Sequence, residues 1–222
     1  MKKLYILCIA LLSLSSLVAQ IDRSVQPSPG PAPEIQLDEP QSFTLKNGMT
    51  VMVVEDHKLP RISATMRIDN PPIFEGELAG ANDLLGSMLG KGSTSIAKND
   101  FEEEVDFMGA SVNFSASGAS AASLSRYFPR VLELMADAAL NPNFLNEEFE
   151  KEKEKLIEGI KSSEKSVSAA ARRVENLITY GANHPYGEYT KIETVSKLNL
   201  EDVKKYYASN YNPKNAYLVV IG

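Results

Sequence analysis

The spacing of the apolar residues changes along the chain, and this change constrains the fold more than any other feature of the sequence. Apolar residues that alternate in short runs predict strands over residues 43–46, 49–55, 61–68, 112–116, 121–125 and 216–222. Apolar residues at helical spacing predict helices over residues 77–90, 100–108, 127–140, 147–162, 167–180 and 201–209. The first two strands flank Asn47-Gly48, a dipeptide typical of a type I′ hairpin turn, and Asn99 is placed to cap the helix over 100–108.

Strands joined by hairpins and mixed with helices predict an α+β fold, in which a mostly antiparallel sheet packs against helices. The sequence contains no internal repeat. We therefore expect residues 41–222 to form a single α+β domain.

The N-terminal residues 1–20 have the pattern of a cleavable signal peptide. Met1-Lys2-Lys3 is basic, Leu4–Val18 is mostly apolar, and Ala19-Gln20 follows. The apolar run is too short for a stable membrane anchor, and Cys8 lies inside it rather than after it, where a lipidated cysteine would stand. Residues 21–40 contain five prolines and predict an extended linker. We expect a periplasmic or secreted protein with no stable membrane anchor after cleavage.

Composition excludes several classes of function. Cys8 is the only cysteine, so the cleaved chain has no disulfide, no cysteine nucleophile and no cysteine-ligated metal. Cleavage also removes Lys2 and Lys3, which leaves 29 acidic and 21 basic residues, so we expect no nucleic-acid partner. The two histidines, His57 and His184, are 127 positions apart and cannot share a helix.

Six segments in order resemble the N-terminal module of the pitrilysin/insulinase family of zinc metallopeptidases, which includes the mitochondrial processing peptidases. They are Asn47–Glu55, Gly80–Thr94, Gly109–Asn113, Tyr127–Phe144 with its Leu140-Asn141-Pro142 stop, His184–Gly187 and Tyr211–Ala216. The resemblance covers about 180 residues and implies the fold of that module. Because family members carry at least one further module, it also implies that this chain is a fragment.

The resemblance fails at the catalytic positions. Active members carry H-x-x-E-H on the helix after Gly80, where the two histidines bind zinc and the glutamate activates water. When the segments are aligned, Asp83 and Ser87 stand at the histidine positions and Gly86 stands at the position of the base. The downstream glutamate ligand, sought through Glu152-Lys153, falls at Gly159. The resemblance therefore implies no catalytic residue and no metal ligand in this chain.

Other interpretations of the residues at these positions, and of the two histidines, remain open. Asp83 and Ser87, four positions apart, could join Glu158 in a loose oxygen site better suited to calcium or magnesium than to zinc. Asp83 is more simply a solvated helix residue. We expect His57 in an exposed turn and His184 packed or hydrogen-bonded in a loop.

One property implied by the resemblance needs no zinc. In the family, the strand that corresponds to Ser111–Ser117 lies at a sheet edge, and substrate peptide adds to it as an extra strand through backbone hydrogen bonds. Asn113, Phe114 and Ser115 are the candidate peptide-binding residues. An ordinary strand with nothing bound is an equally good interpretation of any one of them.

The sequence thus leads to a catalytically inactive family member that serves as partner or peptide-holding subunit of an active zinc peptidase. Zinc is expected only in that partner subunit, and the ligand is an unfolded peptide. Two alternatives remain: an active zinc metalloendopeptidase with a rearranged site, and a stand-alone peptide-binding protein.

Overall fold

A computed structural model describes Gly30 and residues 39–222 of the chain. The predicted signal peptide over 1–20 and nearly all of the predicted linker over 21–40 lie outside the described residues. Among the residues described, no helix combines the length and the apolar character needed to cross a bilayer.

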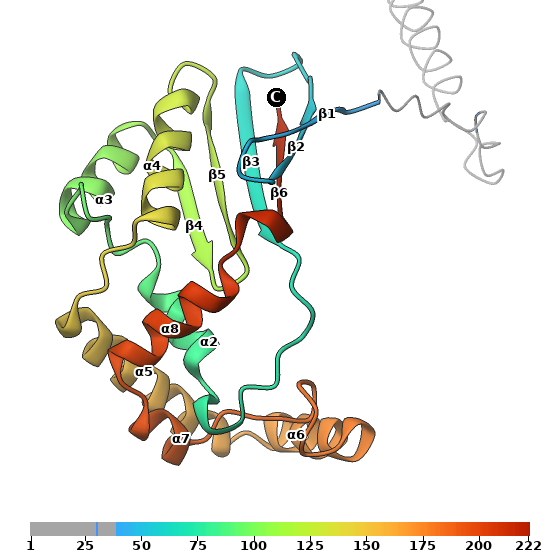
Figure 1. The fold of residues 1–222 in the computed structure, drawn as a ribbon, viewed down its shortest axis with the longest axis vertical. Coiled ribbons are helices and arrows are strands. Elements are labelled where there is room, and N and C mark those ends of the chain that lie inside the picture. The colour runs from blue at the N-terminus through green and yellow to red at the C-terminus, as the bar shows by residue number, and fades with distance from the viewer. Residues whose placement is uncertain (1–29, 31–38) are drawn as a thin grey trace, which may run out of the picture. The chain divides into compact units, whose positions relative to one another are not determined.

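Six strands form one sheet in the order β1-β2-β6-β3-β5-β4 (Figure 1). They are β1 (Gln41–Thr44), β2 (Thr50–Val54), β3 (Arg61–Ile68), β4 (Ser111–Ser115), β5 (Gly118–Leu124) and β6 (Ala216–Ile221). Every neighbouring pair is antiparallel except β2 and β6, which run parallel with Thr50 opposite Tyr217. The predicted α+β fold with a mostly antiparallel sheet is therefore confirmed.

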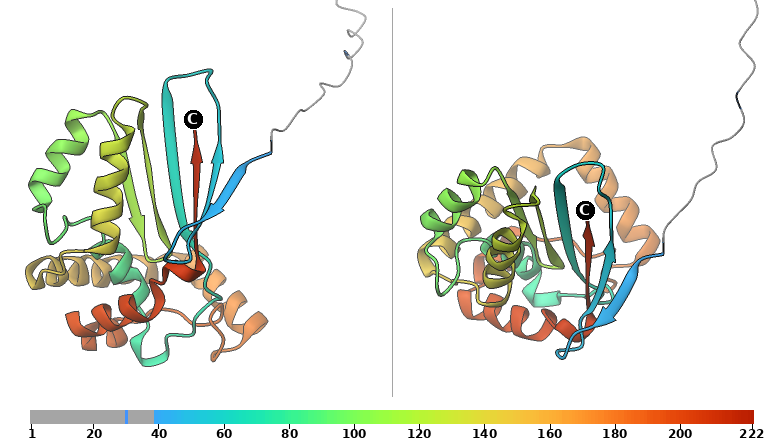
Figure 2. Two further views of the ribbon diagram at one scale, coloured as in Figure 1. Left: turned by 45° about the horizontal axis from the view of Figure 1, so that its top comes forward. Right: turned by 90° about the horizontal axis from the view of Figure 1, so that it is seen from above.

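The helices form two groups around this sheet (Figure 1, Figure 2). The bounds are α2 (Ala81–Met88), α3 (Lys98–Phe107), α4 (Phe128–Leu140), α5 (Asn146–Glu164), α6 (Val167–Tyr180), α7 (Ile192–Lys197) and α8 (Leu200–Asn210), with short 3₁₀ turns η2 (Gly76–Leu78) and η3 (Pro213–Asn215). α3 and α4 lie beside the sheet, whereas α2, α5, α7 and α8 gather at one of its ends.

Each group of helices encloses an apolar core. The first core lies between α3, α4 and one face of the sheet, where alternate residues of β3 such as Ala64, Met66 and Ile68 are buried. The second core lies between α2, α5 and α8, with Leu84, Leu85, Met88, Phe149 and Val203 buried. The alternation in the strands and the helical spacing in α2 thus place the apolar side chains on the buried face of each element.

The structure corrects four local predictions. Only Gly48, with φ of 94°, has positive φ in the first hairpin, so the type I′ turn, which also needs positive φ at Asn47, does not form. Ala97 rather than Asn99 caps α3, so Asn99 lies inside the helix. The helix predicted over 77–90 is divided into η2 and α2, because Gly80 between them adopts a φ of 106°. α7 was not predicted, since six residues give too little periodicity.

Candidate functional site

Helix α2 carries three of the four altered positions, and a carboxylate fixes its first turn. Glu75 accepts hydrogen bonds from the backbone N–H groups of Gly80 and Asn82, both at 2.8 Å. Glu188 in turn accepts from the N–H groups of Glu75 and Gly76, at 2.8 and 2.7 Å. Burial raises the pKa of Glu75 and outweighs the two backbone hydrogen bonds, which lower it. The start of α2 is therefore tied to the loop that contains Glu188.

The side chains on α2 do not form a metal-binding pair. Asp83 is exposed and its Oδ2 accepts a hydrogen bond from Thr190 Oγ1 at 3.3 Å. Ser87 is exposed and donates its hydroxyl to the backbone oxygen of Asp83 at 3.1 Å, within the helix. At Gly86 an added Cβ would lie 3.3 Å from the backbone nitrogen of Ala116, so the helix passes close to the end of β4.

Helix α5 carries the fourth position, Gly159, which is exposed and has no heavy atom within 4 Å of where a Cβ would stand. Two turns earlier, Glu152 is buried and its Oε1 lies 2.9 Å from the Nζ atoms of both Lys91 and Lys155. Burial acts to raise the pKa of Glu152, but the hydrogen bonds from Lys155 and Lys91 prevail and lower it. Glu152 is thus an ionised side chain that links α5 to the segment after α2.

A cavity of about 430 Å³ lies where α2 faces α5 and α6. Asp83 lines one side of it, and Leu156 and Ile160 line another. Gly159 does not line this cavity; it is exposed, although Leu156, three residues earlier on α5, is among the lining residues. Of the four altered positions, the cavity therefore includes Asp83 alone.

The residues of this region do not fit a zinc ion. One carboxylate, one hydroxyl and a glycine replace the expected ligands, and zinc in proteins is held by nitrogen, sulfur and carboxylate ligands. Within residues 39–222 no three His, Cys, Asp or Glu side chains converge in a way that could hold a metal ion. Of the residues considered for a loose oxygen site, Asp83 is bonded to Thr190, and Glu158 pairs with Lys161 at 2.7 Å.

Both histidines lie in loops, as expected. His57 is exposed in the turn between β2 and β3, with Nε2 at 3.4 Å from Glu55. His184 follows α6, stacks on Tyr180 with ring centroids 5.3 Å apart, and accepts the backbone N–H of Tyr186 at its Nδ1 atom.

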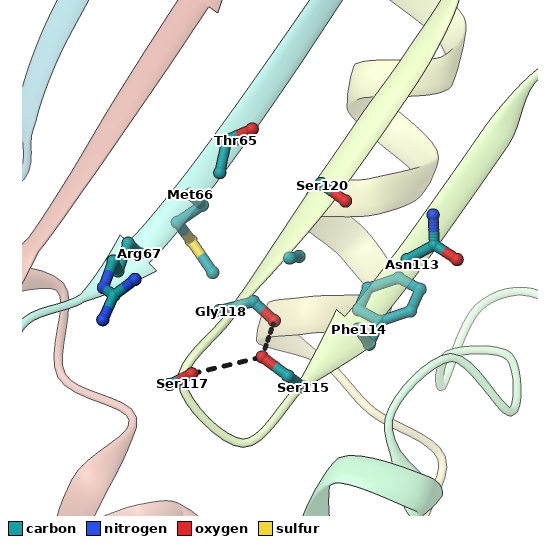
Figure 3. Close-up of a pocket in the computed structure, with 10 residues that line it drawn as sticks. Thr65, Met66, Arg67, Asn113, Phe114, Ser115, Ser117, Gly118 and Ser120 are labelled. Carbon is teal, nitrogen blue, oxygen red and sulfur yellow. Dashed lines mark hydrogen bonds between the residues drawn. The ribbon is translucent and has the colours of Figure 1, made fainter.

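Strand β4 lies at the edge of the sheet and pairs only with β5 in the described sheet. In an antiparallel ladder the backbone groups of alternate residues point to the neighbouring strand and away from it, so one set in β4 faces the open edge. A pocket of about 230 Å³ lies over the face of the sheet, across β4, β5 and β3 (Figure 3). Asn113 and Ser115 line it with Thr65 and Arg67 of β3, and Asn113 stands opposite Ser120 of β5.

The three candidate peptide-binding residues differ in their side chains. Asn113 and Ser115 are exposed, and Ser115 Oγ donates to the backbone oxygen of Gly118 at 3.3 Å (Figure 3). Phe114 is half-buried and packs against both apolar cores, with its ring centroid 6.3 Å from that of Phe101. A peptide added to this edge would therefore contact the backbone of Phe114 and not its side chain.

Sequence reasoning did not find two groups of residues that the fold brings to this region. Glu75 and Glu188 are 113 positions apart and meet through a hydrogen bond from the backbone N–H of Glu75 to the carboxylate of Glu188, and such a long-range contact leaves no pattern in the sequence. Arg172 and Arg173 line the cavity beside Asp83, but in the sequence they are ordinary polar residues of an amphipathic helix.

Comparisons with known proteins find similar sequences and similar folds. The family model described as Insulinase (Peptidase family M16) matches residues 52–187. The chain is 28% identical over 216 residues to the mitochondrial-processing peptidase subunit alpha of Solanum tuberosum. This match covers 90% of this chain and 42% of that protein. The chain is also 25% identical over 191 residues to cytochrome b-c1 complex subunit 1 of Bos taurus. This second match covers 83% of this chain and 39% of that protein.

Among solved structures, the chain is similar to one described as the peptidase M16 inactive domain from Pseudomonas fluorescens, with a TM-score of 0.73 and 21% identity. That match covers 83% of this chain and 46% of the other. The chain therefore spans less than half the length of the proteins that it matches.

Proposed function

Because the chain belongs to the insulinase family, peptidase family M16, we propose that it is a non-catalytic module that holds peptide for an active zinc peptidase subunit. The observation that carries this proposal is the set of side chains at the catalytic positions. Asp83, Ser87 and Gly159 replace the ligands, and Gly86 removes the base that would activate water. No step of peptide hydrolysis can be assigned to these residues.

The open edge of β4 supports the peptide-holding part of the proposal. An extended peptide that pairs with this edge gains backbone hydrogen bonds, which do not depend on a metal. The exposed polar side chains of Asn113 and Ser115 belong to this edge strand, and they also line the pocket that extends from β4 across β5 to β3 and offers space for part of a peptide side chain.

The names of the relatives support the proposal that this chain acts together with a partner subunit. The Solanum tuberosum relative is subunit alpha of a processing peptidase, and the Bos taurus relative is subunit 1 of a complex. The Pseudomonas fluorescens structure is described as an inactive domain. For this chain we propose the same kind of arrangement, in which a separate chain with an intact H-x-x-E-H motif supplies the zinc. The N-terminal sequence pattern supports assembly of the pair in the periplasm or outside the cell.

Co-expression with a motif-intact family member from the same genome tests the partnership. We expect the two chains to co-purify, with zinc bound only to the partner, and the pair to cleave an unfolded peptide faster than the partner alone. Stoichiometric zinc in this chain alone, together with cleavage by it, would establish the rearranged metallopeptidase instead. Peptide binding without co-purification would identify a stand-alone peptide-binding protein.

Backbone-modified peptides test the β4 edge without changing the protein. Two versions of a bound peptide, N-methylated at alternate residues in either register, lose the N–H groups that pair with an edge strand in one register each. We expect one version to bind at least about tenfold more weakly than the unmodified peptide, since each lost hydrogen bond costs about 1 kcal/mol and several are lost. Equal affinity of all three peptides would contradict binding by strand addition.

A further inference from the structure

The cavity of about 430 Å³ that Asp83 lines from α2 has one strongly basic wall. Arg172 and Arg173 of α6 line it, and Asn176, one turn further along α6, lies on the same side. The rest of the cavity lining includes the apolar side chains of Leu156 and Ile160 on α5, and Asp83 on α2. The cavity thus combines two cations, an apolar surface and one carboxylate on separate helices.

Neither guanidinium of this wall is committed to an acidic partner in the described part of the chain. The ion pairs formed there involve other cations, and none joins Arg172 or Arg173 to a carboxylate within 4.0 Å. Arg173 is half-buried, and its Cζ lies 5.6 Å from the centroid of the Tyr189 ring, which restricts the orientation of the guanidinium. Lys191 lies 5.2 Å from the same centroid and adds a third positive charge nearby.

The chemistry of this wall selects a carboxylate. A guanidinium presents parallel N–H donors that match the two oxygens of a carboxylate, and it stays charged at any relevant pH. A metal cation would be repelled by the same side chains. Leu156 and Ile160 provide an apolar surface close to the basic wall, where a hydrophobic side chain can be buried next to the bound carboxylate.

We propose that this cavity binds the C-terminal carboxylate of a peptide whose last side chain is apolar, with the carboxylate at Arg172 and Arg173 and the side chain against Leu156 and Ile160. This inference rests on the proposed peptide-holding function and specifies which end of the peptide is held. Asp83, one of the four altered positions, thus lines a cavity that serves as a site for a peptide terminus.

Asp83 provides an internal check because it has the wrong charge for this ligand. Its carboxylate stands on α2, forms no ion pair with Arg172 or Arg173 within 4.0 Å, and accepts a hydrogen bond from Thr190. Repulsion between Asp83 and a bound carboxylate lowers the affinity, so Asp83→Asn strengthens binding. In a cavity that holds a cation, the same substitution would weaken binding, so the two alternatives predict opposite effects.

Fluorescence anisotropy on the full chain tests the proposal with a short unstructured peptide that is labelled at its N-terminus and ends in leucine. The same peptide with an amidated C-terminus lacks the charge, and we expect it to bind about tenfold more weakly. The double variant Arg172→Gln/Arg173→Gln reduces the affinity for the free acid to that of the amide, and leaves the affinity for the amide unchanged. Asp83→Asn increases the affinity for the free acid only.

Arg126→Gln is the matched control, because it removes an exposed arginine that stacks on Tyr127 at 4.6 Å and does not line the cavity. It leaves both affinities unchanged, and thermal melts of all variants verify that they fold. Equal binding of acid and amide overturns the carboxylate site, while an effect of N-methylation in the same peptide would keep the peptide-holding function. Weaker binding of the free acid to the Asp83→Asn variant also overturns the carboxylate site. Absence of binding by any of these peptides overturns both proposals.

Discussion

At the scale of single residues, Tyr207 and Tyr211 of the second core differ in one hydrogen bond. Their rings stack with centroids 4.9 Å apart, and burial raises the pKa of both phenols. Tyr207 donates its hydroxyl to the backbone oxygen of Ala139 at 2.9 Å. The hydroxyl of Tyr211 is buried and has no hydrogen-bond partner within the described residues. A buried hydroxyl that lacks a partner reduces stability.

We therefore predict opposite effects for two identical substitutions. Tyr211→Phe removes an unsatisfied hydroxyl and raises the free energy of unfolding by about 1 kcal/mol, whereas Tyr207→Phe breaks a hydrogen bond and lowers it by about 1 kcal/mol. Urea unfolding of both variants beside the unsubstituted chain measures the difference. A loss of stability in Tyr211→Phe would mean that its hydroxyl is hydrogen-bonded after all.

Single residues also show where sequence reasoning about the site ends. The exposure of Asp83 follows from its place on the polar side of an amphipathic helix, and this was predictable from spacing. The gathering of Asp83, Arg172 and Tyr189 in one cavity was not, because it depends on how α6 and the loop after it return to α2. Such long-range placement has no periodic signal in the chain.

At the scale of elements, the packing of α2 against β4 depends on a glycine at the end of the helix. Gly90 has a φ of 80°, and an added Cβ would lie 2.5 Å from Cδ2 of Phe114. Gly109, at the end of α3, has a similar φ of 57° but no heavy atom within 4 Å of an added Cβ. The two glycines therefore share the backbone requirement and differ only in the space around them.

This difference predicts unequal costs for the same substitution. Gly109→Ala lowers the free energy of unfolding by about 1 kcal/mol, owing to the left-handed backbone alone. Gly90→Ala adds the displacement of Phe114 and costs about 2–4 kcal/mol in all. Because Phe114 lies in β4, we also expect Gly90→Ala to weaken peptide binding at that edge. Equal stability losses in thermal melts of the two variants would contradict a steric contact between Gly90 and Phe114.

The elements themselves were predictable where the pattern is long or sharply bounded. The residues of β3 and α6 agree with the predicted ranges, since β3 alternates over eight residues and α6 ends at Gly181. The predicted turn at Asn47-Gly48 and the predicted cap of α3 were wrong, because only Gly48 of the pair has a positive φ and Ala97 stands at the N-cap position of α3. The short helix α7 was missed for lack of periodicity.

At the scale of the whole molecule, the sheet is completed by the last strand. β6 enters between β2 and β3 and forms the parallel pair with β2, so residues near both ends of the domain share the centre of one sheet (Figure 2). The sequence predicts the strand but not its position, because pairing partners far apart in the chain leave no local signal. The resemblance to a known family implied an edge position for the strand over Ser111–Ser117 but gave no position for the last strand, and the α+β module it implied is confirmed.

The stability of the whole domain is predicted to decrease in acid, and the sign follows from its carboxyl groups. Arg130 lowers the pKa of Glu104, Ser93 and Ser95 lower that of Asp137, and Lys98 lowers that of Glu148, each through a hydrogen bond to the carboxylate. A lowered pKa in the folded state adds stability that is complete above the ordinary value, 4.5 for Glu and 3.8 for Asp, and is lost as the pH falls through the folded pKa. Glu75 acts in the opposite direction, because burial raises its pKa and protonation then favours the folded state.

The pKa of Glu152 is lowered as well, so four groups oppose one, and the melting temperature falls as the pH is lowered from about 6 to about 3. Asp137→Asn removes one of the four acid-sensitive groups, so it lowers the melting temperature at neutral pH and makes its decline in acid shallower. Glu133→Gln is the matched control, because Glu133 forms an exposed ion pair with Arg130 three residues earlier and leaves the slope nearly unchanged. Calorimetric melts across this pH range measure all three slopes. An Asp137→Asn variant whose stability still declines as steeply as that of the unsubstituted chain would show that Asp137 titrates at its ordinary pKa in the folded protein.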